Sequence, residues 1–132
     1  MKDHTENKTI ETKIASLSLG EGGILKLTID YKNDLTIHDV KELIAAKITI
    51  TREERVAVLV NSINYKIPSR ETRIYIAGEG VARMVKAMAF LITNPVTRIG
   101  ANFFMKINKP RFPFKIFTDE KEAIEWLKRF LA

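Results

Sequence analysis

Few of the residue types that carry out chemistry in proteins occur in this chain of 132 residues. It has no cysteine, which excludes disulfides, thiolate nucleophiles and cysteine metal sites, and it has only two histidines. His4 lies in a polar N-terminal segment, and His38 stands next to Asp39 where a helix is expected to begin. A metal site needs three or four converging ligands, and only Asp34 and Asp39 are near His38 in the sequence. We therefore expect no metal, no cofactor and no enzymatic activity.

The excess positive charge is concentrated in one segment, Gly80–Thr118. The chain has 22 lysines and arginines against 16 acidic residues, a net charge of +6. This segment contains no Asp or Glu, which leaves 15 basic and 16 acidic residues elsewhere. Its cations, interleaved with phenylalanines, are Arg83, Lys86, Arg98, Lys106, Lys109, Arg111 and Lys115. The mixture suits phospholipid headgroups, an acidic protein or nucleic acid. We do not expect nucleic acid, because a charge of this size more often serves solubility.

The basic segment includes an expected helix, Pro95–Asn108, with one apolar side and one mixed side. At 100° per residue, the apolar side is expected to face the core. Its members are Val96, Ile99, Gly100, Phe103 and Ile107. The opposite side carries Arg98, Met105 and Lys109, with Asn102 and Lys106 flanking them. A methionine among cations fits a partner surface, where Met adapts to varied contacts, or shallow insertion at an anionic membrane.

The same helix is expected to lie beside a ligand pocket. In open α/β sheets, ligands bind beyond the carboxyl ends of the strands. The helix start at Asn94, with Arg98 close by, could hold an anionic group there. Fold analogy of this kind gives these candidate ligand- or partner-binding residues: Asn61, Asn94, Arg98, Met105, Lys106, Lys109 and Arg111.

Strand-like runs flank a glycine-rich turn near the N-terminus. Ile14–Leu19 and Ile24–Ile29 are separated by Gly20–Gly23, which predicts a β-hairpin. The glycines are followed by a strand rather than a helix, so they do not form a phosphate-binding loop. Val56–Val60 is a continuous β-branched run, typical of a central strand covered on both faces.

Helices alternate with strands through the rest of the chain. Capping residues mark helix starts at Thr36, Ser69, Asn94 and Asp119. The order β-β-α-β-α-β-α-β-α predicts an α/β fold in which an N-terminal hairpin and β-α units form a mixed sheet with helices packed on it. We expect a flexible polar tail over residues 1–11 and a single domain over residues 12–132. With neither a secretory signal nor a membrane-spanning run in the sequence, we expect a cytoplasmic protein.

The C-terminal third resembles a known family. Asn102–Pro110, followed by Phe114–Leu127 with its aromatic strand, Asp-Glu and Ala-x-x-Trp-Leu, is similar to the SpoIIAA-like group. These are small bacterial proteins with a STAS-like fold, related to Sec14-type (CRAL-TRIO) lipid-binding domains. The resemblance implies a STAS/SpoIIAA-like fold and a regulatory module that binds a protein partner or forms a homodimer. A carrier or sensor of an anionic lipid or another apolar ligand is the alternative.

The resemblance also implies one candidate phosphorylation site. STAS proteins of the anti-anti-sigma type carry a phosphorylatable serine in an Asp-Ser-[Ser/Thr]-Gly-like turn between a central strand and a helix. Here the strand is followed by Asn61-Ser62-Ile63-Asn64, in which Asn replaces Asp and the glycine is missing. The resemblance implies that Ser62 is the residue that would accept a phosphate. The alternative is that Asn61 and Ser62 satisfy backbone groups at the end of the strand.

Overall fold

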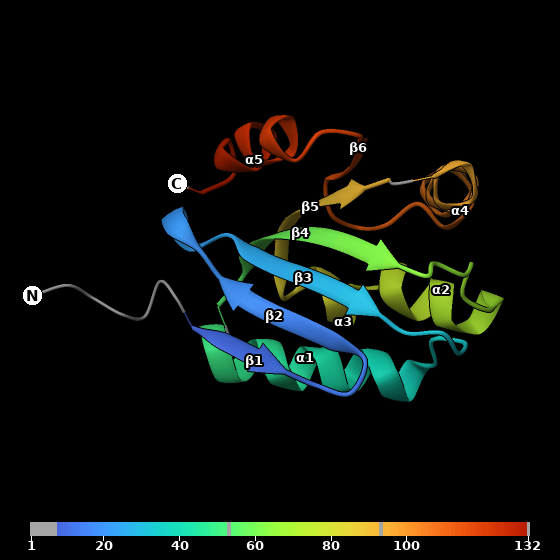
Figure 1. The fold of residues 1–132 in the computed structure, drawn as a ribbon, viewed down its shortest axis with the longest axis horizontal. Coiled ribbons are helices and arrows are strands. Elements are labelled where there is room, and N and C mark those ends of the chain that lie inside the picture. The colour runs from blue at the N-terminus through green and yellow to red at the C-terminus, as the bar shows by residue number, and fades with distance from the viewer. Residues whose placement is uncertain (1–7, 53, 93, 132) are drawn as a thin grey trace, which may run out of the picture.

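A mixed sheet of six strands runs through the computed structural model, which describes residues 8–52, 54–92 and 94–131 (Figure 1). The strands lie side by side in the order of the sequence. They are β1 (Thr9–Glu11), β2 (Ala15–Leu19), β3 (Leu25–Asp30), β4 (Val56–Ile63), β5 (Val85–Leu91) and β6 (Phe114–Phe117). β1, β2 and β3 pair antiparallel, and β3 to β6 pair in parallel. The expected α/β class and the mixed sheet are confirmed.

The first strand extends the hairpin beyond the expected domain boundary. Thr9–Glu11 pairs with Ser16–Ser18, so these residues belong to the sheet and not to a flexible tail. Residues 1–7 of the expected tail lie outside the described residues. The expected turn between β2 and β3 is confirmed as a short 3-10 turn (η2, Glu21–Gly23). Gly22 and Gly23 have φ values of 75° and 82°, which glycine adopts without steric cost.

Helices begin at the capping residues that the sequence indicates. Thr36 and Asp39 form a reciprocal capping box at the start of α1. The side chains of Ser69, Asn94 and Asp119 each accept a hydrogen bond from a backbone N–H three residues on. The helices are α1 (Ile37–Thr51), α2 (Arg70–Ala77), α3 (Glu79–Ala82), α4 (Pro95–Phe103), continued by a π-helical turn η3 (Phe104–Asn108), and α5 (Glu120–Lys128). No helix among them is long and apolar enough to cross a membrane.

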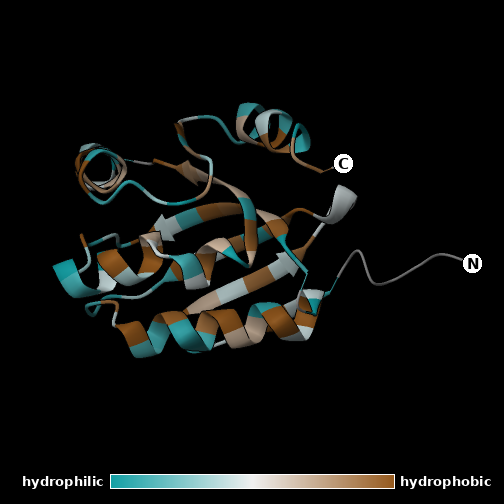
Figure 2. Ribbon diagram, turned by 180° about the vertical axis from the view of Figure 1, so that it is seen from behind, coloured by the Kyte–Doolittle hydropathy of each residue, from teal (hydrophilic) through white to brown (hydrophobic). Residues whose placement is uncertain are grey.

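Two apolar cores lie on opposite faces of the sheet. The first face packs against α1 to α4, and the second against α5. Alternate residues of a strand point to opposite faces, so Val58 and Val60 of β4 join the first core while Ala57 and Leu59 join the second. The prediction of a central strand covered on both faces is confirmed. Figure 2 shows polar and apolar residues alternating along α1, as expected for a helix with one side on a sheet.

Candidate ligand cavity and apolar helix surface

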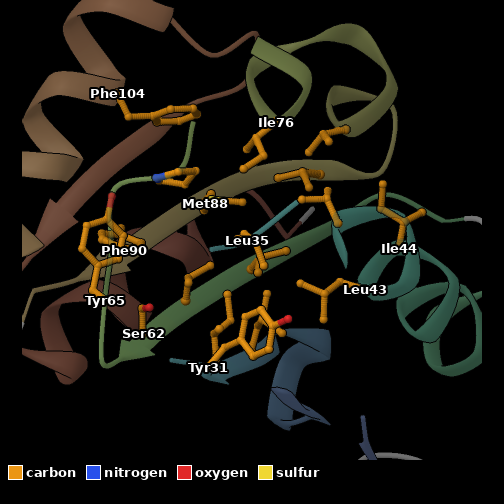
Figure 3. Close-up of a pocket in the computed structure, with 18 of the residues that line it drawn as sticks. Tyr31, Leu35, Leu43, Ile44, Ser62, Tyr65, Ile76, Met88, Phe90 and Phe104 are labelled. Carbon is orange, nitrogen blue, oxygen red and sulfur yellow. The ribbon is translucent and has the colours of Figure 1, made fainter. Parts of the chain in front are cut away.

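An apolar cavity of about 190 Å³ lies between the first face of the sheet and its helices (Figure 3). β3, β4 and β5 line it with residues that include Leu27, Val60 and Phe90. α1 and α2 close it from the other side with Leu43 and Ile76. Leucine, isoleucine, valine, methionine and phenylalanine make up most of the lining. The cavity is therefore an extension of the first core, and side chains leave this space unfilled.

The space remains because the helical cover over β4 and β5 is short. α2 has 8 residues and α3 has 4, whereas α1 has 15. Gly78 ends α2 in an extended conformation, and its N–H donates to the carbonyl of Tyr75. The chain thus covers this part of the sheet with two short pieces instead of one continuous helix.

Polar groups gather where the carboxyl ends of β3 and β4 border the cavity. Tyr31 follows β3 directly, Ser62 lies near the end of β4, and residues 64–66 follow that strand. Lys66 also forms an exposed ion pair with Asp34, with 3.7 Å between the Lys66 Nζ and Asp34 Oδ1 atoms. This is the end of the sheet at which α/β folds bind ligands. An apolar interior with a polar border suits a molecule that has one polar end.

Tyr65 brings a neutral phenol to this border. Burial raises its pKa to about 12, although the positive charge of Arg73 acts in the opposite direction. Its ring meets Phe90 edge to face, with the ring centroids 5.7 Å apart. Within the described parts of the chain, no side chain or backbone group forms a hydrogen bond with Tyr65 Oη. The phenol can therefore donate to, or accept from, a polar group in the cavity.

A buried lysine lies toward the opposite end of the cavity. Lys47 of α1 is 5% exposed, and its ammonium donates to the backbone carbonyl of Glu54. Its Nζ atom also lies 3.5 Å from the sulfur of Met84. Lys47 and Met84 both line the cavity, and the Glu54 carbonyl binds the charged end of the lysine.

Asn61 and Ser62, expected together after the end of the strand, lie on opposite faces of the sheet. Both belong to β4, which continues to Ile63, so the expected loop begins later than predicted. Ser62 is 7% exposed and lines the cavity. The alternation of the strand directs Asn61 to the second face. There its buried Oδ1 has no hydrogen-bond partner among the described residues.

Helix α4 is turned differently from the sequence expectation. Its buried residues are Thr97, Gly100 and Ala101, and Phe104 follows them in η3. The large apolar residues expected in the core are exposed instead, with exposed fractions of 56% for Val96, 39% for Phe103, 63% for Ile99 and 61% for Ile107. Only Gly100 of the predicted inner side is buried.

Close packing against the loop after β4 explains this orientation. A Cβ atom added to Gly100 would lie 2.5 Å from Cε2 of Tyr65 and 2.9 Å from Cγ1 of Ile67. The helix can approach these side chains only with small residues on its inner side. A prediction from hydrophobicity alone places the larger apolar side chains in the core, and for α4 this prediction is wrong.

The predicted binding residues of the basic segment do not converge on the cavity. Arg98 and Met105 border an open groove between α4 and β6, together with Asn102, Lys115 and Glu122. Asn94 caps α4 by accepting hydrogen bonds from the backbone N–H and the hydroxyl of Thr97. The side chains of Lys106, Lys109 and Arg111 are exposed.

The polar border of the cavity was not identified from the sequence. Tyr31 and Tyr65 are the residues of interest, and both follow the end of a parallel strand. Because ligands of α/β sheets bind beyond the carboxyl ends of the parallel strands, this position in the sequence could have indicated both tyrosines. The cavity itself arises from the lengths and positions of α2, α3 and α4, which periodicity does not determine.

Comparison with known proteins identifies a family without assigning an activity. Residues 18–131 match the model of a family described as Domain of unknown function (DUF7793). The chain belongs to this family. A crystal structure of a protein with unknown function from Arthrobacter sp. FB24 is 31% identical, over 84% of this chain and 96% of that one, with a TM-score of 0.32. No curated protein matches the chain.

Proposed function

We propose that this DUF7793 domain binds a small apolar molecule with one polar group in the cavity on the first face of the sheet. The observation that carries the proposal is the space of about 190 Å³ lined mostly by apolar side chains. An engineered apolar cavity of about 150 Å³ in another protein stays dry and binds benzene. An apolar ligand would gain free energy there by leaving water.

The volume limits the size of the ligand. Pockets for drug-sized molecules measure roughly 300–1,000 Å³, which is larger than this cavity of about 190 Å³. A single ring or a short alkyl chain fits inside, whereas a whole phospholipid does not. We therefore narrow the carrier or sensor hypothesis to small apolar molecules, or to one chain of a larger lipid.

The polar end of the ligand belongs at the carboxyl ends of β3 and β4. The neutral phenol of Tyr65 and the hydroxyl of Ser62 can both donate and accept hydrogen bonds there. Lys66 adds a cation at the same border. These three side chains could bind a ligand whose polar group is either a phenol or a carboxylate.

The biological role that we propose is regulatory and non-catalytic, in the cytoplasm. The N-terminal hairpin and the β-α order are consistent with a STAS/SpoIIAA-like arrangement, in which such a domain would report ligand binding to a partner. A phosphorylation switch at Ser62 receives less support, because its hydroxyl lies in a buried strand and would have to become exposed to accept phosphate.

Calorimetric titration with p-cresol and with hexanoate tests the proposal. The Val60→Phe variant should fill the cavity and weaken binding at least about tenfold, while the added ring keeps or raises the melting temperature. Val96→Phe makes the same change at an exposed site of α4 and should bind like the wild type. Unchanged binding by folded Val60→Phe protein, or no binding of either probe, would refute the cavity as a ligand site.

A further inference from the structure

The outer side of α4 and η3 carries an apolar stripe that no other part of residues 8–52, 54–92 and 94–131 covers. We define the α4 stripe as Val96, Ile99, Phe103 and Ile107, which lie on one side of the helix and are all exposed. At 1.5 Å per residue the stripe is about 16 Å long. Ile67, 43% exposed, lies next to it across Gly100. Contiguous exposed apolar surface of this kind marks an interaction site.

Cations border the stripe on both sides. The guanidinium of Arg73 lies 4.7 Å from the ring centroid of Phe103 and is held by Asn108 and the carbonyl of Pro68. The exposed Lys106 lies at the other edge of the stripe. Arg98 lies farther around the helix, at the groove between α4 and β6. Neither α4 nor η3 contains an acidic residue. Glu122 lines the same groove as Arg98.

The cations beside the stripe favour an anionic surface over a second copy of the chain as its binding partner. A twofold interface would bring the same cations of a second copy close to Arg73 and Lys106, which is unfavourable. An anionic surface would neutralise these cations instead. The homodimer expected from the family resemblance stays a prediction, for which the edge strands β1 and β6 offer other surfaces.

We propose that the α4 stripe docks on the surface of an anionic lipid bilayer. Helix α4 would lie in the plane of the interface, with Ile99 and Phe103 at the boundary between headgroups and acyl chains. Arg73 and Lys106, at the two edges of the stripe, would then contact lipid phosphates. The bilayer is preferred to an acidic protein because α4 also borders the cavity, through Ala101 on its inner side. Docking would place the cavity beside the phase in which apolar molecules dissolve.

Co-sedimentation with lipid vesicles tests the docking. The full chain should bind vesicles made of equal parts phosphatidylcholine and phosphatidylglycerol, and bind pure phosphatidylcholine weakly. The triple variant Val96→Ser, Ile99→Ser, Ile107→Ser should bind the anionic vesicles at least about tenfold more weakly, because three apolar side chains no longer enter the interface. Ile74→Ser, which removes an exposed isoleucine on α2, serves as the matched control and should bind like the wild type.

Charge variants separate the electrostatic part of docking from the apolar part. Lys106→Gln should lower the affinity for anionic vesicles about fivefold and leave binding to pure phosphatidylcholine unchanged. Lys121→Gln, on α5, should change neither. High salt should weaken binding of the wild type and of the stripe variant alike.

Three outcomes would overturn the proposal. They are no binding to anionic vesicles at low salt, equal binding by the folded stripe variant, and self-association that only the stripe variant abolishes. The last would assign the stripe to a second copy of the chain. The choice of a bilayer rests on the proposed role of the cavity, but the two proposals are tested separately. Val60→Phe should lose binding of the small probes and still bind vesicles normally, so a failure of one proposal is distinguishable from a failure of the other.

Discussion

The phenol of Tyr65 lies directly against the bare Cα of Gly100, where a Cβ atom would be 2.6 Å from the phenol oxygen. This contact joins the loop after β4 to helix α4 and determines which side of the helix faces inward. It also positions Tyr65 at the border of the cavity. One glycine therefore affects both the cavity and the orientation of the α4 stripe.

Gly100→Ala is expected to destabilise the protein by about 1–3 kcal/mol, because the added methyl group overlaps the Tyr65 ring and forces it to move. The loss outweighs the gain of up to about 1 kcal/mol that alanine gives in a helix. Gly80→Ala is the matched control, since a Cβ there meets nothing within 4 Å. Chemical denaturation of both variants measures the difference. A Gly100→Ala protein as stable as Gly80→Ala would contradict the close packing.

The pKa of Tyr65 predicts a loss of stability at high pH. Burial raises the folded-state pKa from 10.0 to about 12, so the folded state binds the phenolic proton more tightly than the unfolded state. The resulting stabilisation is complete below pH 10 and is lost as the pH rises toward 12. The unfolding free energy of the wild type should therefore decline across this range more steeply than that of Tyr65→Phe. Parallel pH profiles for the two proteins would show that Tyr65 is not the titrating group.

The capping box of α1 predicts a defined local contribution. Thr36 Oγ1 accepts from the N–H of Asp39 at 3.1 Å, and Asp39 Oδ2 accepts from the N–H of Thr36 at 2.9 Å. Thr36→Ala should cost about 1 kcal/mol of unfolding free energy. Thr49→Ala, on an exposed turn of the same helix, should cost little. Equal losses in the two variants, measured by urea denaturation, would count against the cap.

The two cores should respond independently to substitution. Leu127 of α5 is fully buried in the second core, and Leu127→Ala should cost about 2–5 kcal/mol. Because the cavity lies on the other face of the sheet, the folded variant should bind p-cresol and hexanoate with the affinity of the wild type. Weakened binding by the folded variant would show that the two faces are coupled.

The sequence predicts those parts of this fold that depend on local rules. Turn glycines, capping residues and alternation locate the hairpin, the helix starts and the central strand correctly. The side of α4 that faces inward could not be predicted in this way. It depends on the contact of Gly100 with Tyr65, two residues that are far apart in the sequence. Asn61 and Ser62 were expected in the turn after the strand because the length of β4 was underestimated.

The order of the strands has a consequence for how the chain acquires its structure. Each strand pairs with the strand that precedes it in the sequence, so during synthesis each new strand meets a neighbour that is already made. The second core is an exception, because α5 covers Leu59 and Ala89 only after all six strands have formed. Until then the apolar residues of one face of the nascent sheet stay exposed, and exposed apolar surface of this kind favours aggregation.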